Sequence, residues 1–341
     1  MDTPDTAELG SSGLRVPRIG IGSAALGGLY YSVDEDEAVR TVRRAVELGA
    51  SYVDTAPLYG HGRSERIVGQ ALSPLARGDY VLSTKVGRVL EPVSAPSASD
   101  YFVDLPPFEP VFDYSRSGVL RSLEESLERM GLDSVDVLYV HDPDEGRSVF
   151  HAFSGPDHYR QVIDEVMPTL SELRSQGVIR AVGVGMNGWQ MLAQFARDGD
   201  FDCFLLAGRY TLLDQSALPE FLPLCESKNI SVVIGGPYNS GILASDLSLG
   251  ATYFYDQAPP AVLERARSIK AICDRYGVPL KAAALQFCLA HPAVASVIPG
   301  ARSVEEAEEN CEMVLVPIPA DMWAELRQAR LIPADAPALT G

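Results

Sequence analysis

The sequence predicts an α/β fold, specifically a closed (β/α)8 TIM barrel, from three observations. Short β-branched or apolar runs alternate with amphipathic stretches of helical length, which indicates parallel strands joined by helices. Eight such runs occur, and this eightfold alternation favours a closed barrel over an open, doubly wound sheet. The length of 341 residues fits one barrel domain over residues 1–341, because barrels of about 250 residues or more commonly form a single domain.

The predicted strands are near-continuous apolar runs, as expected for a sheet buried on both faces. They span residues 18–23, 51–56, 80–86, 135–142, 179–186, 203–208, 230–237 and 294–301. The predicted helices carry an apolar stripe and close on a glycine, and they span residues 34–49, 117–131, 167–177 and 260–277. Residues 7–20 predict a β-hairpin ahead of the first barrel strand, placed to close the bottom of the barrel.

Two long insertions interrupt the regular alternation. Residues 88–115, rich in Pro, Ser and aromatic residues, follow the third strand, and residues 142–158 follow the fourth. Long loops of this kind in a compact domain are usually binding loops or disordered segments. We expect these two, with the tail 331–341, to determine which substrate is bound.

The composition excludes several classes of partner. The formal net charge is −18, which argues against nucleic acid and against anionic membranes. Neither a run of about 18 apolar residues nor the apolar core of a signal peptide is present in the sequence. The five cysteines are dispersed and read as reduced thiols. These features predict a cytoplasmic protein without a bound metal, and they leave the oligomeric state open.

Three predicted strands carry an ionisable residue at the end where such barrels place their active sites, namely Asp54, Lys85 and His141. Lys85 lies inside an apolar strand, so it must lose its hydration, which is costly without a counter-charge. Asp54, at the matching height of the neighbouring strand, can supply that charge. A purely structural ion pair is the alternative, and His141 by itself would read as a core histidine.

Tyr59 follows Asp54 by five residues and adds a phenol to this group. A phenol has an ordinary pKa of about 10, and a neighbouring ammonium would lower it. Asp54 would keep Lys85 charged, while His141 could hydrogen-bond a substrate oxygen. Together these residues could exchange a proton with a carbonyl or alcohol, and only a hydride carrier is missing.

The segments that carry these residues resemble the aldo-keto reductase family from about residue 15 to residue 330. The similar segments are VDTAPLYGHGRSERIVGQAL, LSTKVG, VDVLYVHDPD, GVGMNGWQ and VASVIPGARSVEEAEEN. The resemblance implies a catalytic tetrad of Asp54, Tyr59, Lys85 and His141. In it Tyr59 is the general acid/base, Lys85 and Asp54 tune it, and His141 orients the substrate.

The resemblance also implies hydride exchange with a nicotinamide cofactor bound in an extended form. The residues it implies for that cofactor are Ser23, Asn187, Pro237, Tyr238, Asn239, Gly241, Gly300, Arg302, Ser303, Glu306 and Asn310. For Tyr238, packing within the loop is the alternative. The chain departs from the family at Ala207, where many members have a Gln, and at Gly235, where they stack a Tyr on the ring. The nicotinamide must therefore be held differently.

The segment PGARSVEEAEEN favours NAD, with NADP as the alternative. A 2′-phosphate needs a basic side chain, and only Arg302 is present among several glutamates. Glu306 stands where many NADP-using relatives carry an Arg, and a carboxylate there repels a phosphate. The alternative is that these acids merely complement the helix dipole.

Longer runs narrow the resemblance to a sugar-oxidising branch, which includes D-threo-aldose 1-dehydrogenases, L-fucose dehydrogenases and a pyridoxal 4-dehydrogenase. The similar runs are AALGGLY, LLAGRYTLLDQ and GGPYNSGILA. This implies oxidation of the C1 hemiacetal of an aldose such as L-fucose, D-arabinose or L-galactose to the lactone. The alternatives are an NADPH-dependent aldehyde or ketone reductase, a pyridoxal 4-dehydrogenase, and a cofactor-binding regulatory subunit like the family's ion-channel accessory proteins.

Overall fold

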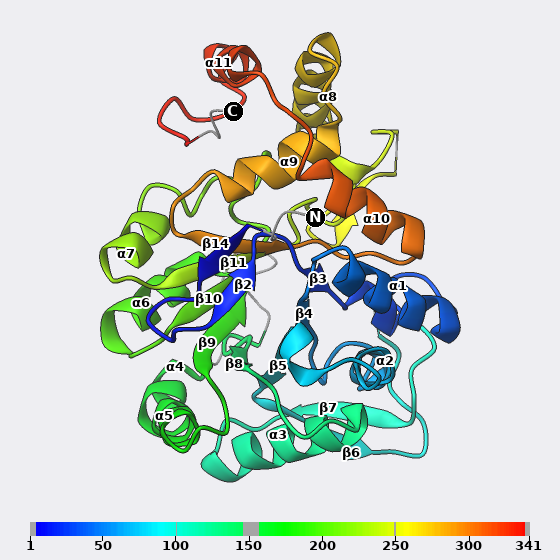
Figure 1. Cartoon of the computed structure of the whole chain (residues 1–341), viewed down its shortest axis with the longest axis vertical. Helices are drawn as coiled ribbons and strands as arrows, with labels where there is room; N and C mark the ends of the chain where they lie inside the picture. Colours follow the sequence, from blue (N-terminus) through cyan, green and yellow to red (C-terminus); the bar gives the residue numbers. More distant parts are fainter. Residues whose placement is uncertain (1–4, 100, 146–156, 249, 338–341) are drawn as a thin grey trace.

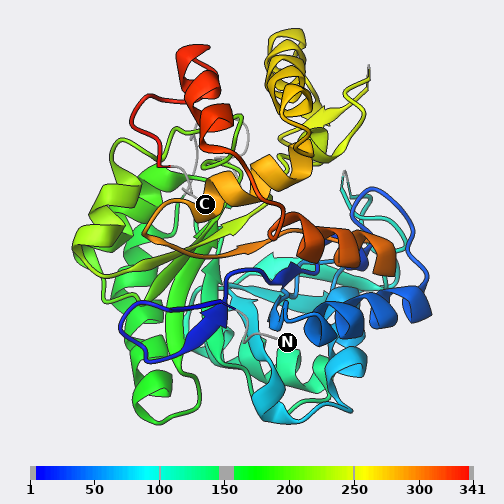
Figure 2. The same ribbon diagram turned by 45° about the horizontal axis from the view of Figure 1, so that its top comes forward.

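The computed structural model describes residues 5–99, 101–145, 157–248 and 250–337. Eight parallel strands form one sheet in the order β14, β11, β10, β9, β8, β5, β4, β3. Two parallel bridges, from Ile19 to Val297 and from Gly22 to Gly300, join the outer strands of that sheet. The sheet therefore closes on itself, and the predicted (β/α)8 TIM barrel is confirmed (Figures 1 and 2).

All eight predicted strands are present, with bounds shorter than the apolar runs that predicted them. They are β3 (Ile21–Gly22), β4 (Tyr52–Asp54), β5 (Val81–Val86), β8 (Val137–His141), β9 (Ala181–Met186), β10 (Cys203–Ala207), β11 (Ser231–Gly235) and β14 (Val294–Ile298). Every residue of β4, β8, β9 and β14 is buried. The runs lack alternation because helices cover one face and side chains fill the barrel on the other.

Helices surround the barrel on its outer face (Figure 1). They are α1 (Glu35–Glu47), α2 (Arg63–Leu72), α3 (Arg116–Met130), α5 (Met167–Ser175), α6 (Trp189–Asp198), α7 (Phe221–Ser227), α9 (Leu280–Leu289) and α10 (Val304–Met313). Two further helices, α8 (Pro260–Arg275) and α11 (Ala320–Gln328), lie together at the top of Figure 1. The helix predicted from residue 167 begins earlier, because α4 (Tyr159–Gln161) and a π-helical turn, η4 (Val162–Val166), lead directly into α5.

The predicted N-terminal hairpin is formed by β1 (Thr6–Glu8) and β2 (Arg15–Pro17), which pair antiparallel. Its buried side chains Leu9, Leu14 and Val16 join the apolar cluster that also contains Tyr52 and Tyr139 from the barrel strands. The hairpin therefore packs against the barrel interior, at the end where the strands begin. The opposite end of the barrel, where the strands finish, is the end at which an active site is expected.

The long connection after β5 is also confirmed, and it contains a second hairpin, β6 (Arg88–Pro92) with β7 (Phe108–Phe112). Val89 and Leu90 are buried within it, which explains why an apparently irregular segment is ordered. Of the connection after β8, residues 146–156 lie outside the described part. A third excursion, between β11 and α8, was not predicted and carries a short ladder of β12 (Thr252–Tyr253) and β13 (Asp256–Gln257).

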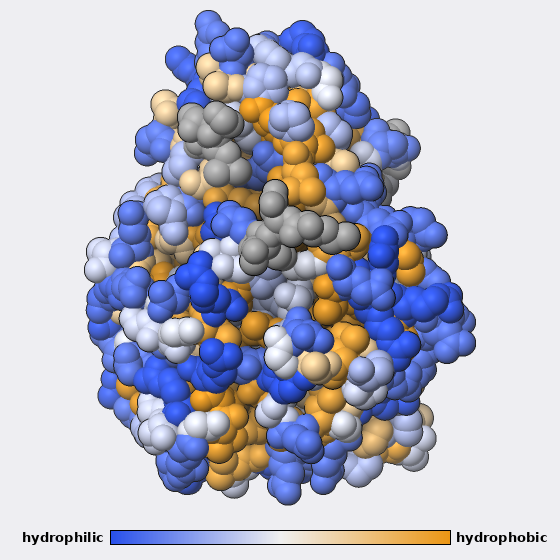
Figure 3. Space-filling model, in the orientation of Figure 1, coloured by the Kyte–Doolittle hydropathy of each residue, from blue (hydrophilic) through white to orange (hydrophobic). Residues whose placement is uncertain are grey.

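The surface seen in Figure 3 is dominated by hydrophilic residues, with apolar residues in smaller groups between them. Among the described residues, every helix is too short or too polar to cross a bilayer.

Candidate active site

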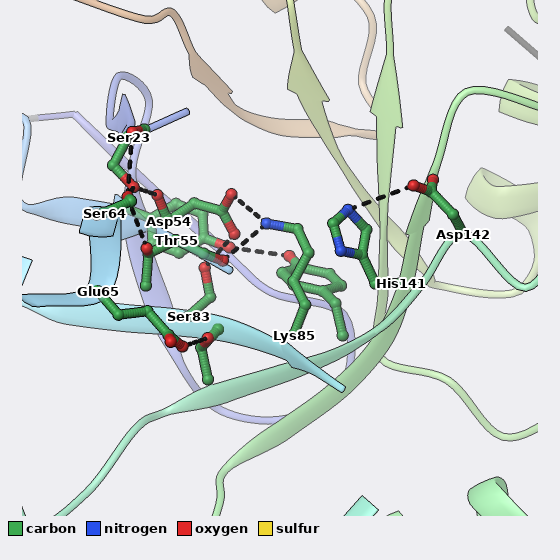
Figure 4. Close-up of polar contacts among 12 residues, drawn as sticks. Ser23, Asp54, Thr55, Ser64, Glu65, Ser83, Lys85, His141 and Asp142 are labelled. Carbon is green, nitrogen blue, oxygen red and sulfur yellow. Dashed lines mark hydrogen bonds and ion pairs between the residues drawn. The ribbon is translucent and has the colours of Figure 1, made fainter. Parts of the chain in front are cut away.

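A buried ion pair occupies the C-terminal end of β4 and β5. Lys85 Nζ lies 2.6 Å from Asp54 Oδ2, and the two side chains are only 1% and 2% exposed. Lys85 also donates to the backbone oxygen of Thr55 at 2.9 Å, and Ser83 Oγ donates to Asp54 Oδ1 at 2.7 Å. The neighbouring strands β4 and β5 thus hold Asp54 and Lys85 side by side, and each charge has hydrogen-bond partners. Figure 4 shows the lysine pointing from β5 toward the carboxylate.

Tyr59 sits on a tight turn between β4 and α2. Lys85 Nζ lies 4.6 Å from the centre of the Tyr59 ring. The imidazole of His141 meets that ring edge-on, with the ring centres 5.8 Å apart. Within the described residues the Tyr59 hydroxyl makes no hydrogen bond, so it is available to a bound molecule. The structure therefore brings together all four residues that the sequence singled out.

The pKa of Tyr59 departs from the prediction. Burial, followed by the carboxylates of Asp54 and Asp142, raises this pKa well above its ordinary value, and the guanidinium of Arg88 opposes the rise. We had expected Lys85 to lower it. The main reason for the difference is burial of the phenol, and in addition Lys85 is hydrogen-bonded to Asp54, whose carboxylate offsets much of its positive charge. Burial also lowers the pKa of Lys85 itself, against the opposing effect of Asp54.

The ring of His141 is buried and neutral. Burial and then the positive charges of Arg88 and Lys85 lower its pKa well below the ordinary value. Its Nε2 lies 3.5 Å from Asp142 Oδ2 (Figure 4), and its Nδ1 is buried and has no partner in the part of the chain that the structure describes. Tyr114 donates to the backbone oxygens of His141 and Asp142 at 2.6 and 2.8 Å, which fixes the end of β8.

Sequence reasoning missed two charged residues of this site. Arg88 and Asp142 form a second buried ion pair at 3.0 Å, beside His141. Arg88 opens the β6–β7 hairpin and Asp142 directly follows β8, so no spacing in the sequence links them. The only signal was the acid next to His141, in the segment VHDPD.

Aromatic residues from three different loops line the same region. Phe102 lies 6.4 Å from Tyr59 between ring centres, and Tyr101 packs edge-on to Tyr255 at 5.5 Å. Tyr255 comes from the unpredicted excursion after β11. Burial raises its pKa, and the side chain of Asn187 opposes that rise. The site is therefore assembled partly from segments that are far apart in the sequence.

Several residues expected at a cofactor make contacts within the protein. Ser23 is fully buried, and its hydroxyl bonds the Asp54 backbone oxygen at 2.7 Å, so it stabilises strand ends. Tyr238 donates to Asn310 Oδ1 at 2.8 Å, which supports the loop-packing alternative as well. Asn239 donates to the Gly208 oxygen at 3.0 Å and is 2% exposed. The flanking Pro237 is buried too, and Gly241 takes a positive φ of 98°.

Asn187, which directly follows β9, is also buried: it is 8% exposed and donates to the Ala207 oxygen at 3.2 Å. The residues around the start of α10 are more accessible. Gly300 is exposed, and its oxygen accepts from Asn310 Nδ2 at 3.2 Å. Ser303 caps α10 by accepting from the Glu306 backbone N–H at 3.3 Å.

The basic side chains near α10 are each paired with one of its acids. Glu306 accepts from the backbone N–H of Arg302 at 2.8 Å and from its guanidinium. Burial would raise the pKa of Glu306, but the hydrogen bonds from Arg302 outweigh it, so the pKa is lowered. Likewise Glu309 pairs with Lys281, and Glu308 pairs with Arg44 at 2.7 Å.

The fold and this site define an oxidoreductase that uses a nicotinamide cofactor, and comparison with known proteins identifies the family. The model of the aldo/keto reductase family matches residues 18–330. The chain is 40% identical to a pyridoxal 4-dehydrogenase from Microbacterium luteolum, over 95% of this chain and 97% of that one. It is 37% identical to a D-threo-aldose 1-dehydrogenase from a Pseudomonas species, over the same shares. This chain belongs to the aldo/keto reductase family.

Two further comparisons agree with that assignment. An L-galactose dehydrogenase from Arabidopsis thaliana is 32% identical, over 90% of this chain and 86% of the relative. The holo form of an aldo-keto reductase from Bacillus halodurans has the same fold, with a TM-score of 0.73 and 26% identity over 98% of both chains. The protein is thus an NAD(P)-dependent oxidoreductase whose family acts on small molecules.

Proposed function

We propose that this protein is an NAD-dependent dehydrogenase that oxidises the C1 hemiacetal of an aldose, such as L-fucose, D-arabinose or L-galactose, to the lactone. The observation that carries the proposal is the buried Lys85–Asp54 pair set against the Tyr59 ring at the C-terminal ends of the strands. The similarity to a D-threo-aldose and an L-galactose dehydrogenase supports a sugar as substrate.

The chemistry assigns a task to each of the four residues. Ionised Tyr59 accepts the proton of the C1 hydroxyl while the electrons of the C1–H bond leave as hydride. A bound nicotinamide cofactor supplies the hydride acceptor. Lys85, fixed by Asp54 and facing the Tyr59 ring, stabilises the negative phenolate. His141, neutral in its buried setting, hydrogen-bonds the substrate oxygen.

The described residues fit a nicotinamide cofactor. The amide of Asn187 would hold the nicotinamide end, where Ala207 and Gly235 offer no polar side chain. At the start of α10 the backbone N–H groups of Arg302, Val304 and Glu306 donate to Glu306, Glu37 and Ser303, and the phosphate-bearing end would take the place of these acceptors. The carboxylate of Glu306 can accept hydrogen bonds from ribose hydroxyls.

The preference for NAD rests on the ion pairs around α10. Arg302 is engaged by Glu306, so a 2′-phosphate would meet a neutralised guanidinium and a repelling carboxylate. We expect kcat/KM with NAD to exceed that with NADP by about 10-fold or more. Glu306→Gln should shift this ratio toward NADP by about 10-fold, since it frees Arg302. The control is Glu308→Gln, also on α10, which breaks the pair of Glu308 with Arg44 of α1 and should leave the ratio unchanged.

A substrate panel tests the proposed reaction. L-fucose, D-arabinose, L-galactose and pyridoxal are offered with each cofactor, and lactone formation is followed together with reduced nicotinamide. The similarity to a pyridoxal 4-dehydrogenase makes pyridoxal the second candidate, because it too closes to a cyclic hemiacetal. Rapid NADPH-linked reduction of aldehydes, with no sugar oxidised, would replace the proposal by an aldehyde reductase.

A further inference from the structure

The Arg88–Asp142 pair lies at the site but has no part in the four-residue chemistry. Its side chains are 7% and 14% exposed, and Nη2 of Arg88 lies 3.0 Å from Oδ2 of Asp142. The same carboxylate oxygen faces His141 Nε2 at 3.5 Å, on the side of the ring away from Lys85 (Figure 4). A second ion pair therefore borders the place where the reacting carbon must sit.

This pair has unused hydrogen-bonding capacity. Arg88 Nη1 is buried and has no partner within the described residues, and the same is true of His141 Nδ1. A guanidinium carries five N–H donors and a carboxylate only acceptors, so together they complement a hydroxyl, which both donates and accepts. Because a buried donor without a partner is costly, such an atom suggests a missing ligand group.

The pair is also rigidly held. The Arg88 guanidinium stacks on Phe112 at 4.7 Å from the ring centre, and its backbone oxygen accepts from Ser122 Oγ at 3.0 Å. Asp142 is fixed through its backbone, which donates to Gly185 O and accepts from Tyr114. A polar pair set on an aromatic surface can discriminate between substrates, because neither partner can turn away to find another contact.

We propose that Arg88 and Asp142 determine specificity by binding a substrate hydroxyl on the carbon next to the one that is oxidised, with Asp142 accepting its hydrogen and Arg88 Nη1 donating to its oxygen. The inference rests on the proposed function and deepens it, since a 2-hydroxyl is present in aldoses and absent from simple aldehydes. The placement follows from the neighbours: Asp142 touches His141, and both charges act on the Tyr59 hydroxyl.

The experiment measures the discrimination for hydroxylated substrates in the wild type and in Asp142→Asn and Arg88→Lys. The readout is the ratio of kcat/KM for an aldose to that for its 2-deoxy form and, in reduction, for lactaldehyde to propanal. Asn is chosen because Asp142 has a φ of +43°, which Asn tolerates. The matched control is Asp202→Asn, which breaks the Arg174–Asp202 pair at the other end of the barrel.

We expect the wild type to favour the hydroxylated member of each pair by about 100-fold or more, as sites built to bind a hydroxyl do. Asp142→Asn and Arg88→Lys should reduce that preference about 10-fold or more, because the loss in kcat/KM falls mainly on the hydroxylated member of each pair. Asp202→Asn should keep the wild-type ratio.

An unchanged ratio in both variants would overturn the inference. If kcat/KM for propanal and lactaldehyde then fell equally, the pair would only support His141. The proposed function fails separately, if the wild type oxidises no aldose. The lactaldehyde-to-propanal ratio then still decides whether the pair reads a hydroxyl.

Discussion

Lys85 is the residue on which the proposed chemistry depends most. It is one of four lysines in the chain, and it is buried to 1% exposure with its charge matched by Asp54. Removing the ammonium leaves Asp54 buried and unpaired, which typically costs about 3–5 kcal/mol of stability. Loss of activity in a single variant could therefore reflect loss of folding.

We expect Lys85→Met to lower kcat for oxidation by about 10²-fold or more, because the phenolate of Tyr59 loses its positive neighbour. The double variant Asp54→Asn/Lys85→Met removes both charges and should recover most of the stability without recovering the rate. Circular dichroism and thermal unfolding measure the first quantity, and steady-state kinetics measure the second. Near wild-type turnover in a folded Lys85→Met protein would rule out the assigned role.

The pH dependence follows from the raised pKa of Tyr59. Only the ionised phenol accepts a proton, so the rate of oxidation increases with pH until the tyrosine is fully ionised. Because kcat/KM reports the free enzyme, whose Tyr59 pKa lies above 10, kcat/KM should still be rising at pH 10. Lys85→Met should move the rising part of the pH–rate profile to still higher pH. A flat profile between pH 6 and 10, with chemistry shown to be rate-limiting, would contradict the role of Tyr59.

Tyr59→Phe provides the complementary test. The ring remains for packing against Lys85 and Phe102, while the proton-transferring hydroxyl is lost. We expect kcat to fall by about 10²-fold or more, with cofactor affinity measured by fluorescence little changed. If turnover of every sugar and aldehyde were unaffected, a cofactor-binding regulatory role would become the better reading.

At the scale of elements, the turn between β4 and α2 decides where Tyr59 points. Gly60 has a φ of +60°, and a Cβ built on it would lie 2.1 Å from the backbone oxygen of Gly27. In turn, the N–H of Ser64 donates to the Tyr59 oxygen at 3.1 Å and ties the turn to α2. Two loops therefore pack backbone against backbone here, and only glycine allows it.

Gly60→Ala should therefore displace Tyr59 and lower kcat by about 10²-fold, the scale expected for a misplacement of about 1 Å. The control is Gly177→Ala, which has a φ of +74° but open space around its Cβ. It should lose about 1–2 kcal/mol of stability from the left-handed backbone alone and keep its kcat. If both variants lose stability equally and retain activity, the contact with Gly27 does not position Tyr59.

For the whole molecule, the interior determines how the five cysteines behave. Cys203, Cys225, Cys273 and Cys288 are buried, and Cys311 is half-buried on α10. Burial raises the pKa of Cys225 to about 12, and that of Cys311 to about 11. All five are free thiols, in agreement with their dispersed spacing in the sequence.

We expect a thiol reagent such as dithionitrobenzoate to react with the folded protein slowly and at Cys311 alone. Only a small fraction of that thiol is ionised, and the other four thiols are buried. In denaturant all five thiols should react, and Cys311→Ser should abolish the native reaction. Absorbance of the thiolate released from the reagent measures the reaction in the folded and in the denatured protein. Rapid reaction of two or more thiols in the folded state would contradict the described burial.

Much of this molecule could be predicted before its structure. The eight strands follow from eight apolar runs, and the hairpin follows from the turn-rich segment before the first of them. Asp54, Lys85 and His141 could be grouped because parallel strands in a barrel all finish at one end, so residues at strand ends must be neighbours. The position of Tyr59 beside these residues, on the turn after β4, was predicted from the resemblance to a family and not from its spacing alone.

The sequence by itself determined the barrel, its plugged bottom and the set of strand-end residues, because these depend on periodicity and on chain order. The tertiary structure alone decided that Arg88 meets Asp142, that Tyr255 packs on Tyr101, and that Arg302 is neutralised by Glu306. It also reversed the expected pKa shift of Tyr59. Such contacts and pKa shifts depend on how loops fold over the barrel and on the sum of burial and nearby charges, which residue order does not specify.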